Sequence, residues 1–328
     1  MIDLKAVLVN NDSRQLYIGE ALKPSISEEE ILVKVKATAL NRADLMQKRG
    51  LYPPPEGASP ILGLEMSGVI EEIGEHVQGV KIGDRVCALL PGGGYAEYVA
   101  IPAAMAIPIP NHFSFVEAAA IPEVFLTAYM NLFWFGRLQK GQTVLIHAGA
   151  SGVGTAAIQL AREAGAKIIV TAGSHEKRKL CLSLGAHHAI DYKAGPFANA
   201  VKEITAGKGV DLILDFIGAP YWQQNIDSLA VDGRLILIGM MGGSKIDQVN
   251  LSPLLMKRIQ VIGTTLRSQP VDKKVALTKE FTEFALTKLT LGAIKPIIDS
   301  IWNWDQANEA HEHMEQNKNA GKIVLQVK

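Results

Sequence analysis

The feature that most constrains this chain is a glycine-rich turn between an apolar run and a helical stretch, in the segment VLIHAGASGVGTAAIQLAREAGA at 144–166. The apolar run ends at Ala148, the turn carries Gly149, Gly152 and Gly154, and apolar residues then recur at helical spacing. Glycine lets backbone N–H groups approach a pyrophosphate, whose charge a helix N-terminus stabilises. The spacing is G-x-x-G-x-G rather than the commoner G-x-G-x-x-G, so a tight connection without a ligand is the alternative.

The segments that follow this turn favour a dinucleotide site. From Gly141 to Thr265 apolar runs alternate with helical stretches. The pattern predicts strands over 143–148, 166–172, 188–191, 211–218, 234–239 and 260–266, and helices over 154–165, 176–185, 196–207 and 221–230. Such alternation predicts right-handed βαβ crossovers and a doubly wound parallel sheet.

The end of the second predicted strand indicates which dinucleotide binds. An acidic side chain there would accept hydrogen bonds from the ribose of NAD, but this strand runs into Gly173, Ser174 and, one helical turn later, Lys177. Gly173 leaves room, Ser174 can donate a hydrogen bond and Lys177 can pair with a 2′-phosphate, so we predict NADPH. The alternative, compatible with the first, is a solvated basic helix face with Ser174 as its N-cap.

Further cofactor contacts are expected where other strands end, because open α/β sheets bind ligands at the carboxyl ends of their strands. Packing or turn structure is the alternative at each position. Thr127 and Ser151 are candidates for contacting the nicotinamide amide. The complete set of predicted cofactor-binding residues is Thr127, Gly149, Ser151, Gly152, Val153, Gly154, Gly173, Ser174, Lys177, Tyr192, Ile217, Gly218, Met240, Gly242, Leu266, Arg267 and Asn317.

The rest of the chain has a different pattern, and a length of 328 residues predicts two domains. Up to about residue 120, short β-rich runs alternate with turns, which predicts a compact β-rich domain. After Thr265 come a helical stretch over 271–289, an apolar run over 296–302, a helix near 305–317 and a strand over 321–327. These last elements could extend the parallel sheet or return to the first domain, and the residues alone leave both arrangements open.

Charge and cysteine content argue against several classes of protein. Lys plus Arg and Asp plus Glu both total 33, so no net field favours nucleic acid or an anionic membrane as a partner. Two cysteines, Cys87 and Cys181, cannot build a disulfide scaffold or a four-cysteine zinc site. The first residues do not follow a signal-peptide pattern, and apolar runs stay well under the ~20 residues of a membrane span. We therefore expect a cytoplasmic protein.

Several segments spread over nearly the whole chain match a known pattern: ALNRADLMQ at 39–47, GLEMSGVIEEIG at 63–74, KIGDRV at 81–86, ALLPGGGYAEYV at 88–99, the glycine-rich turn within 144–166, called the phosphate loop below, and NAGKIVL at 319–325. In these segments the chain resembles the medium-chain dehydrogenase/reductase superfamily. Within it the chain is most similar to the zinc-independent quinone oxidoreductases, in the p53-inducible, zeta-crystallin-like group.

The resemblance implies a Rossmann doubly wound parallel sheet over 123–267 and a β-rich GroES-like catalytic domain made of 1–122 and 268–328. It places the C-terminal helix and strand in the catalytic domain and NADPH in the cleft between the domains. It also suggests a homodimer joined through an edge strand of the nucleotide domain. The apolar run at 260–266 suits such pairing, and a covered internal strand is the alternative.

A comparison with zinc-dependent members of the superfamily predicts that no catalytic metal is bound. Those enzymes carry a cysteine where this chain has Asn41, a histidine where it has Leu64, and a third ligand near Glu123. Asparagine and leucine cannot replace a thiolate and an imidazole on Zn²⁺.

The histidines do not suggest a second metal site. The pairs His187–His188 and His311–His313 lack the spacing that brings two side chains together on a helix. We expect surface or loop roles for all four.

Without zinc, reduction of a quinone is the reaction we predict, which makes the chain an NADPH:quinone oxidoreductase. Zinc stabilises the alkoxide that forms when an alcohol loses hydride, whereas a quinone becomes aromatic on reduction and needs no metal. The alternatives are an enone or 2-alkenal reductase on the same scaffold and a non-enzymatic, crystallin-like protein that binds NADPH or RNA.

The resemblance also implies the catalytic residues. It places Asn41 and Tyr52 beside the nicotinamide with Asp44 nearby, and the Tyr52 hydroxyl could bind the substrate oxygen or supply a proton through water. The alternatives are a turn-capping amide for Asn41, an N-cap for Asp44, and a ring packed beside Pro53–Pro55 for Tyr52.

Overall fold

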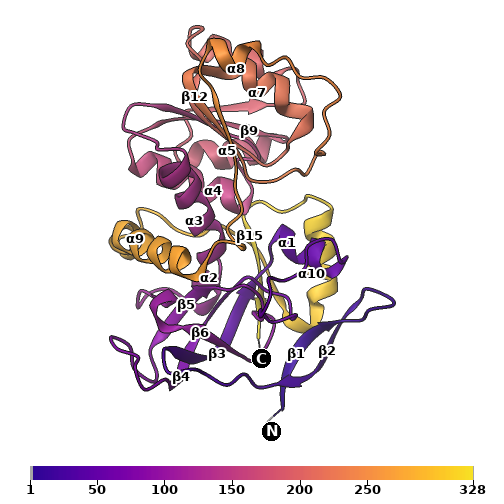
Figure 1. The fold of residues 1–328 in the computed structure, drawn as a ribbon, viewed down its shortest axis with the longest axis vertical. Coiled ribbons are helices and arrows are strands. Elements are labelled where there is room, and N and C mark those ends of the chain that lie inside the picture. Colours follow the sequence, from indigo (N-terminus) through magenta and orange to yellow (C-terminus); the bar gives the residue numbers. More distant parts are fainter. Residues whose placement is uncertain (1–2, 328) are drawn as a thin grey trace. The chain divides into compact units, whose positions relative to one another are not determined.

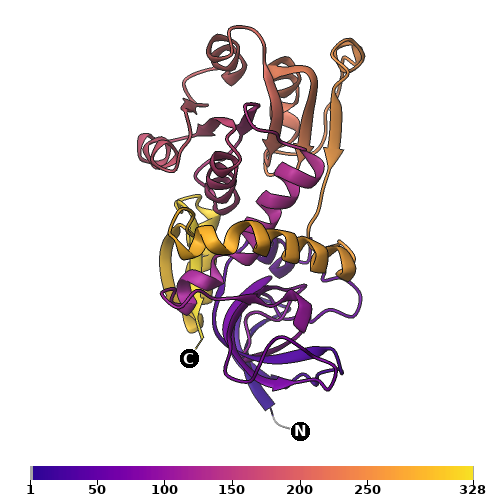
Figure 2. The same cartoon turned by 90° about the vertical axis from the view of Figure 1, so that its left-hand side faces the viewer.

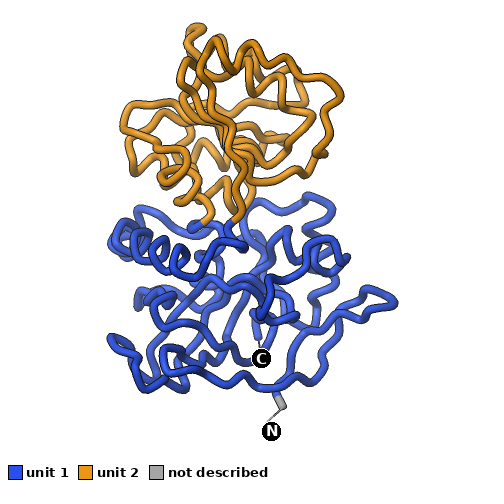
Figure 3. The backbone as a smooth tube through the Cα atoms, viewed as in Figure 1, with its two compact units in different colours: residues 1–126, 266–328 blue, residues 127–265 orange. Residues whose placement is uncertain are grey.

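The structure, a computed structural model, describes residues 3–327, which form two compact units (Figure 1 and Figure 3). One unit, called unit 1 here, holds the described chain up to Leu126 and again from Leu266 onward; unit 2 is the continuous stretch Thr127–Thr265. Each unit has its own sheet and its own apolar core.

Unit 2 is built on a six-stranded sheet in the order β10-β9-β8-β11-β12-β13, and all of its strands are parallel. The strands are β8 (Thr143–Ile146), β9 (Lys167–Ala172), β10 (His188–Asp191), β11 (Val210–Asp215), β12 (Leu229–Leu237) and β13 (Gln260–Gly263). The chain places β9 and β10 on one side of β8 and β11 to β13 on the other. The predicted Rossmann sheet is therefore confirmed, and its order reverses between β8 and β11, where such sheets bind ligands.

Helices cover this sheet, and its central strands β8, β9 and β11 are accordingly buried on both faces. They are α4 (Gly152–Glu163), α5 (His175–Ser183), α6 (Phe197–Ile204), α7 (Trp222–Ser228) and α8 (Ser252–Met256). Helix α3 (Pro122–Tyr129) begins in unit 1, enters unit 2 at Thr127 and leads into a π-helical turn, Met130–Phe135. Figure 2 gives a second view of these helices around the strands. The core joins Leu145, Ile213 and Leu235 of the strands to Phe197 and Val201 of α6, all at most 1% exposed.

Unit 1 contains a mostly antiparallel sheet in the order β14-β15-β3-β4-β5-β7, with β6 paired to β3, so the predicted β-rich GroES-like domain is confirmed. Its strands are β3 (Glu30–Ala39), β4 (Glu65–Ile73), β5 (Arg85–Leu89), β6 (Tyr98–Pro102), β7 (Ile107–Pro108), β14 (Ile298–Asn303) and β15 (Lys322–Gln326), and β1 (Asp3–Val9) forms a hairpin with β2 (Leu16–Leu22). The helices are α1 (Arg42–Lys48), α2 (Phe115–Ala119), α9 (Val271–Thr290) and α10 (Ala307–Glu315); Figure 2 shows α9 along its length.

The arrangement of the last elements, which the residues alone left open, is settled by strand pairing. β15 runs antiparallel to β3, with Leu325 opposite Thr38, and β14 runs parallel to β15. The C-terminal elements therefore join the sheet of unit 1 and not the parallel sheet of unit 2.

The surface role expected for His311 is wrong. This side chain of α10 is 0% exposed, its Nε2 lies 3.1 Å from the hydroxyl of Tyr95, and burial lowers its pKa to about 3. It shares the buried face of α10 with Ala307 and Met314. His187 and His188 are exposed, and the half-buried His313 pairs with Asp299 at 2.9 Å.

No helix within residues 3–327 combines the length and the apolar character that crossing a bilayer requires.

Candidate active site and cofactor-binding loops

The phosphate loop of unit 2, between β8 and α4, requires glycine at a specific position. After β8 ends, Ala148 takes a positive φ of 48°, and Ser151 caps α4 by accepting the N–H of Gly154 on its hydroxyl at 3.0 Å. A Cβ on Gly154 would lie 2.5 Å from the carbonyl oxygen of Ala148, so glycine is required there. The N–H groups of Gly152 and Val153 precede the first hydrogen bonds of the helix, which leaves them available to an anion.

The predicted contacts at the end of β9 lie together. Ser174 caps α5, accepting the N–H of Lys177 on its hydroxyl at 3.3 Å, so the N-cap role considered for it is confirmed. Tyr192 packs against Gly173, where an added Cβ would meet the tyrosine hydroxyl at 2.6 Å. Gly173, Ser174, Lys177 and Tyr192 thus lie at the carboxyl ends of β9 and β10.

A carboxylate that the sequence reasoning missed lies at the same strand ends. Asp191 ends β10 and pairs with Ala172, the last residue of β9. Its Oδ2 accepts a hydrogen bond from Arg178 Nη1 at 2.5 Å. Because the guanidinium neutralises it, Asp191 repels a 2′-phosphate less than an unpaired carboxylate would.

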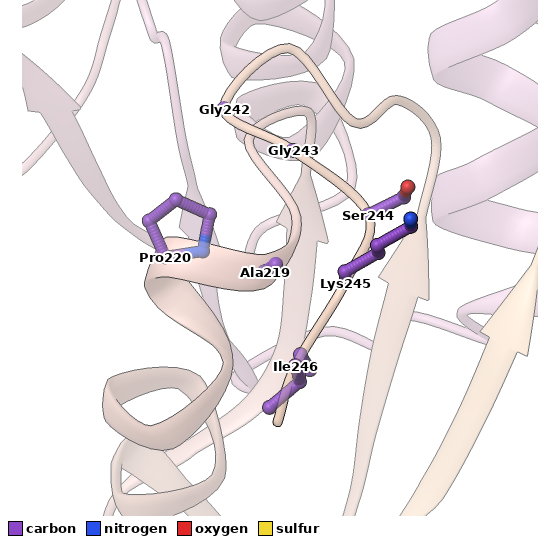
Figure 4. A pocket seen from close by; sticks show the side chains of 7 residues that line it. All are labelled: Ala219, Pro220, Gly242, Gly243, Ser244, Lys245 and Ile246. Atoms are coloured by element: carbon purple, nitrogen blue, oxygen red, sulfur yellow. The ribbon is translucent and has the colours of Figure 1, made fainter. Parts of the chain in front are cut away.

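The loops after β11 and β12 are joined by hydrogen bonds. Asp215, fully buried, accepts the N–H of Ile217 at 2.7 Å and that of Gly218 at 3.3 Å, and Gly242 N donates to the carbonyl of Ile217 at 2.8 Å. Beside them is an open pocket of about 490 Å³ (Figure 4), lined by Ala219, Pro220 and the segment 242–246. Ile217, Gly218, Met240 and Gly242 therefore belong to one loop pair.

A buried polar chain connects these loops to the phosphate loop. His147 follows β8, is 0% exposed, and lies 2.7 Å from Asn225 Oδ1 and 3.0 Å from Thr171 Oγ1. Asn225 Nδ2 in turn donates to Asp215 Oδ2 at 3.0 Å. Burial lowers the pKa of His147 to about 4, so the ring is neutral near pH 7. These hydrogen bonds connect the start of the phosphate loop, after β8, to the loop that follows β11.

The remaining predicted contacts are divided between the units. Thr127 lies in unit 2, is 7% exposed, and accepts Asn131 Nδ2 on its carbonyl at 2.8 Å. Leu266, Arg267 and Asn317 lie in unit 1. Asn317, with a φ of 55°, accepts a hydrogen bond from Arg42 on Oδ1.

In unit 1, the segment around Asn41 and Asp44 forms a tight helix start. Asn41 is the N-cap of α1, and Asp44, at the third helical position, accepts the Asn41 N–H at 2.8 Å and the Gly63 N–H at 3.0 Å. Asp44 is 0% exposed, and burial raises its pKa to about 6 despite these two bonds. The N-cap role considered for Asp44 is thus wrong. The N-cap is Asn41, and Asp44 lies in the first turn of α1, where its carboxylate accepts the N–H of Asn41.

The Asn41 side chain is held by a buried ion pair that the sequence reasoning did not identify. Lys322 Nζ lies 2.7 Å from Glu65 Oε1 and donates to Asn41 Oδ1 at 2.8 Å and to the Leu40 carbonyl at 2.6 Å. Asn41 Nδ2 donates to Glu65 Oε1 at 2.9 Å. One feature of the sequence could have indicated this pair: each of the two apolar segments ILGLE and NAGKIVL contains one charged residue, Glu65 and Lys322.

These side chains do not fit a zinc ion. Leu64 is 1% exposed and packed in the core, and the carboxylate of Glu65 is neutralised by an ammonium. An ammonium that donates three hydrogen bonds cannot coordinate a cation, and neither can an aliphatic side chain. Within residues 3–327, no three His, Cys, Asp or Glu side chains are grouped as a metal site would need.

The ring of Tyr52 packs against the guanidinium group of Arg267, which belongs to the same unit. The Arg267 guanidinium carbon is 5.2 Å from the centre of the tyrosine ring, within the range of a cation–π contact. Burial raises the pKa of Tyr52, so its hydroxyl keeps its proton at neutral pH. The hydroxyl can then donate as well as accept a hydrogen bond.

The chain matches two known protein families, in two separate parts of its sequence. An alcohol dehydrogenase GroES-like domain matches residues 27–111, and a zinc-binding dehydrogenase domain matches residues 152–283. A quinone oxidoreductase of Rattus norvegicus is 30% identical over 312 residues, which cover 94% of this chain and 92% of the relative. The chain belongs to the medium-chain dehydrogenase/reductase superfamily of oxidoreductases.

Other relatives carry different names. The synaptic vesicle membrane protein VAT-1 homolog of Danio rerio is 33% identical over 318 residues; the match covers 92% of this chain and 65% of the relative, so the chain spans just under two thirds of that protein. A mycobacterial protein solved in complex with NADPH has a TM-score of 0.87 at 28% identity, covering 98% of this chain and 99% of its own. The quinone oxidoreductase of Pseudomonas syringae also has a TM-score of 0.87, at 29% identity, covering 99% of this chain and 100% of its own.

Proposed function

We propose that the protein is an NADPH-dependent quinone oxidoreductase that works without a catalytic zinc ion. The observation that carries the proposal is the cluster of Lys322, Glu65 and Asn41: the Lys322 ammonium is bonded to Asn41, which stands where zinc-dependent members of the superfamily carry a cysteine ligand. The similarity to quinone oxidoreductases and to a protein solved with NADPH supports it.

The cofactor would be held by the predicted residues of unit 2. Gly149, Ser151, Gly152, Val153 and Gly154 form a loop whose free N–H groups suit the pyrophosphate. Gly173, Ser174, Lys177 and Tyr192 suit the 2′-phosphate and its ribose, in keeping with the neutralised carboxylate of Asp191. The remaining proposed contacts are Thr127, Ile217, Gly218, Met240 and Gly242 in unit 2 and Leu266, Arg267 and Asn317 in unit 1.

The catalytic residues we propose are Asn41, Asp44 and Tyr52, each with a separate task. The Glu65–Lys322 pair fixes the Asn41 amide, while its carbonyl oxygen has a second lone pair with which to accept a hydrogen bond. Asp44 holds the start of α1 against Gly63 and so positions Asn41. The protonated Tyr52 hydroxyl can donate to a carbonyl oxygen of the substrate.

The chemistry suits a quinone better than an alcohol. When bound, NADPH would supply hydride, and the acceptor would gain aromaticity, so no metal is needed to stabilise an alkoxide. The chain's own part is to hold the acceptor and to deliver a proton to its oxygen.

We also propose a homodimer formed through β13. This strand is an end strand of the sheet in unit 2 and pairs on one side with β12. Its other edge leaves backbone N–H and C=O groups for a second copy, and exposed apolar residues lie nearby in sequence: Met240, Met241, Leu251, Leu255 and Met256.

The deciding experiment measures oxidation of NADPH and of NADH by the purified protein, with ortho-quinones, para-quinones and 2-alkenals as acceptors. The proposal predicts turnover of quinones with NADPH preferred, and no loss of turnover after treatment with a zinc chelator. Faster turnover of alkenals would instead assign an enal reductase, and binding of NADPH without turnover of any acceptor would leave a non-enzymatic protein.

A further inference from the structure

Glu123, the second residue of α3, is a partly buried acidic residue that the proposed mechanism does not use. Its backbone N–H donates to Glu65 Oε2 at 2.9 Å. Its side-chain Oε2 is buried and has no hydrogen-bond partner within residues 3–327. Polar atoms in a protein interior are paired in the great majority of cases, so this oxygen suggests a partner that the chain itself does not provide.

The surroundings of Glu123 keep its proton in place at neutral pH. The pKa of Glu123 is raised to about 8, chiefly by burial; the carboxylates of Glu65 and Asp44 also raise it, and the cations Lys322 and Arg267 lower it. Acidic, phenolic and basic groups all interact electrostatically with Glu123. The acidic ones are Asp44 on α1 and Glu65 on β4, the phenol is Tyr52, and the basic ones are Arg267, Lys274 on α9 and Lys322 on β15. Glu123 is therefore a hydrogen-bond donor near pH 7, since a protonated carboxyl group carries an O–H.

Arg267 provides a second donor without a partner. The residue is 4% exposed, its Nε donates to the Pro91 carbonyl at 2.9 Å, and its Nη2 donates to Gln47 Oε1 at 2.7 Å. Its Nη1 is buried and has no hydrogen-bond partner among the described residues. A guanidinium that is fixed over the Tyr52 ring, with both N–H groups of Nη1 unpaired, can hold an oxygen atom of a ligand.

We propose that Glu123 is the acid that protonates the carbonyl oxygen of the acceptor, and that Arg267 Nη1 donates a hydrogen bond to an acceptor oxygen. This inference rests on the proposed function and identifies a proton donor for it. Reduction of a quinone to a hydroquinone takes one hydride, which carries both electrons, and one proton. The Glu123 O–H bond breaks as the O–H bond of the hydroquinone forms, and the carboxylate then takes a proton from water.

The test compares Glu123→Gln with the wild-type protein and with Glu283→Gln, which alters an exposed carboxylate on α9. Glutamine keeps the size and the hydrogen-bonding capacity of the side chain but cannot transfer a proton. We expect kcat for the quinone to fall about 100-fold or more in Glu123→Gln, with the KM for NADPH changed less than about twofold. Glu283→Gln should match the wild-type protein.

The pH profile separates proton transfer from a structural role. In the wild-type protein kcat should fall as the pH rises through about 8, because the acid form of Glu123 is lost. This fall should be absent in Glu123→Gln. A Glu123→Gln variant that keeps kcat within about twofold and keeps the wild-type pH profile would overturn the inference while leaving quinone reduction intact.

A binding measurement tests the Arg267 part without turnover. Titration calorimetry with a non-reducible phenolic analogue of a hydroquinone should show about tenfold or more weaker binding to Arg267→Met than to the wild-type protein. Arg267→Lys, which keeps the cation, should bind with intermediate affinity if the variant keeps the wild-type melting temperature. Equal affinities in the wild-type and Arg267→Met proteins would remove Arg267 from the site. Failure of the proposed function itself would appear differently, as no quinone turnover by the wild-type protein.

Discussion

Lys322 Nζ lies 2.7 Å from Glu65 Oε1, and the two side chains are 4% and 0% exposed. Lys322→Met should destabilise unit 1 by about 3 to 5 kcal/mol, because it leaves Glu65 as an unpaired buried charge. The double variant Lys322→Met/Glu65→Gln should recover much of this loss.

The free energy of unfolding in urea measures both effects. Arg49→Met, which breaks an exposed pair with Glu315, is the control and should change stability little. A double variant no more stable than Lys322→Met alone would contradict the explanation.

Gly154→Ala should weaken binding of NADPH about tenfold or more, because its Cβ would lie 2.5 Å from the Ala148 carbonyl oxygen and displace the phosphate loop. Gly263→Ala, in the same unit, is the matched control, since nothing lies within 4 Å of the added carbon. Quenching of tryptophan fluorescence by NADPH compares the two. Similar affinities in both variants would mean that the loop does not bind the cofactor.

Lys177→Ala should raise the KM for NADPH about tenfold and leave the KM for NADH nearly unchanged, since only NADPH carries the 2′-phosphate. Steady-state kinetics with both cofactors measures the difference, and Lys179→Ala, at an exposed position of the same helix, is the control. Equal effects of Lys177→Ala on the two cofactors would reject its proposed role.

Tyr52→Phe and Asn41→Ala should each change kcat or KM for the quinone by more than about twofold. Tyr52→Phe removes one hydroxyl, whereas Asn41→Ala also removes the contacts to Glu65 and Lys322 and should lower the melting temperature. Turnover and calorimetric melting of the same preparations distinguish a catalytic loss from a loss of fold. If neither variant alters turnover, these two residues do not contact the substrate.

Acid should destabilise unit 1 through His311. Burial lowers its pKa from about 6.5 to about 3, so its contribution to stability is complete above pH 6.5 and is lost as the pH falls toward 3. Between pH 7.5 and 5 the wild-type protein should lose about 2 kcal/mol more than His311→Gln, which cannot take up a proton. Urea unfolding at the two pH values measures this difference. The same pH dependence in both proteins would show that His311 does not cause it.

Much of the fold was predictable because parallel strands buried on both faces leave a direct pattern in the sequence. The six strands of unit 2 all occur where apolar runs predicted them. Local signals were weaker where the chain changes direction. The helix expected over 221–230 ends at Ser228, and β12 begins at Leu229 without a break. α1 was not predicted, although Asn41 and Asp44 have the spacing of a helix start.

The polar interior of unit 1 was harder to predict, because it depends on contacts between residues far apart in the chain. Lys322 and Glu65 meet only because β15 and β4 both flank β3. His311 was misjudged for a related reason: pair spacing was used to test for a metal site, whereas the apolar positions Ala307 and Met314 on the same helix face indicate burial. No local pattern in the sequence indicates that Glu123 Oε2 and Arg267 Nη1 are buried without a hydrogen-bond partner among the described residues.

The place of β15 beside β3 also has a consequence for the order in which the protein forms during synthesis. Unit 2 is continuous, so it can fold as soon as Thr265 has left the ribosome. The edge of β3 that β15 covers stays open until residues 322–326 have emerged, and the Glu65 carboxylate has no ammonium partner until Lys322 arrives. During that interval the nascent chain carries a finished nucleotide-binding unit and an unprotected strand edge, which is the stage at which aggregation or chaperone binding would act.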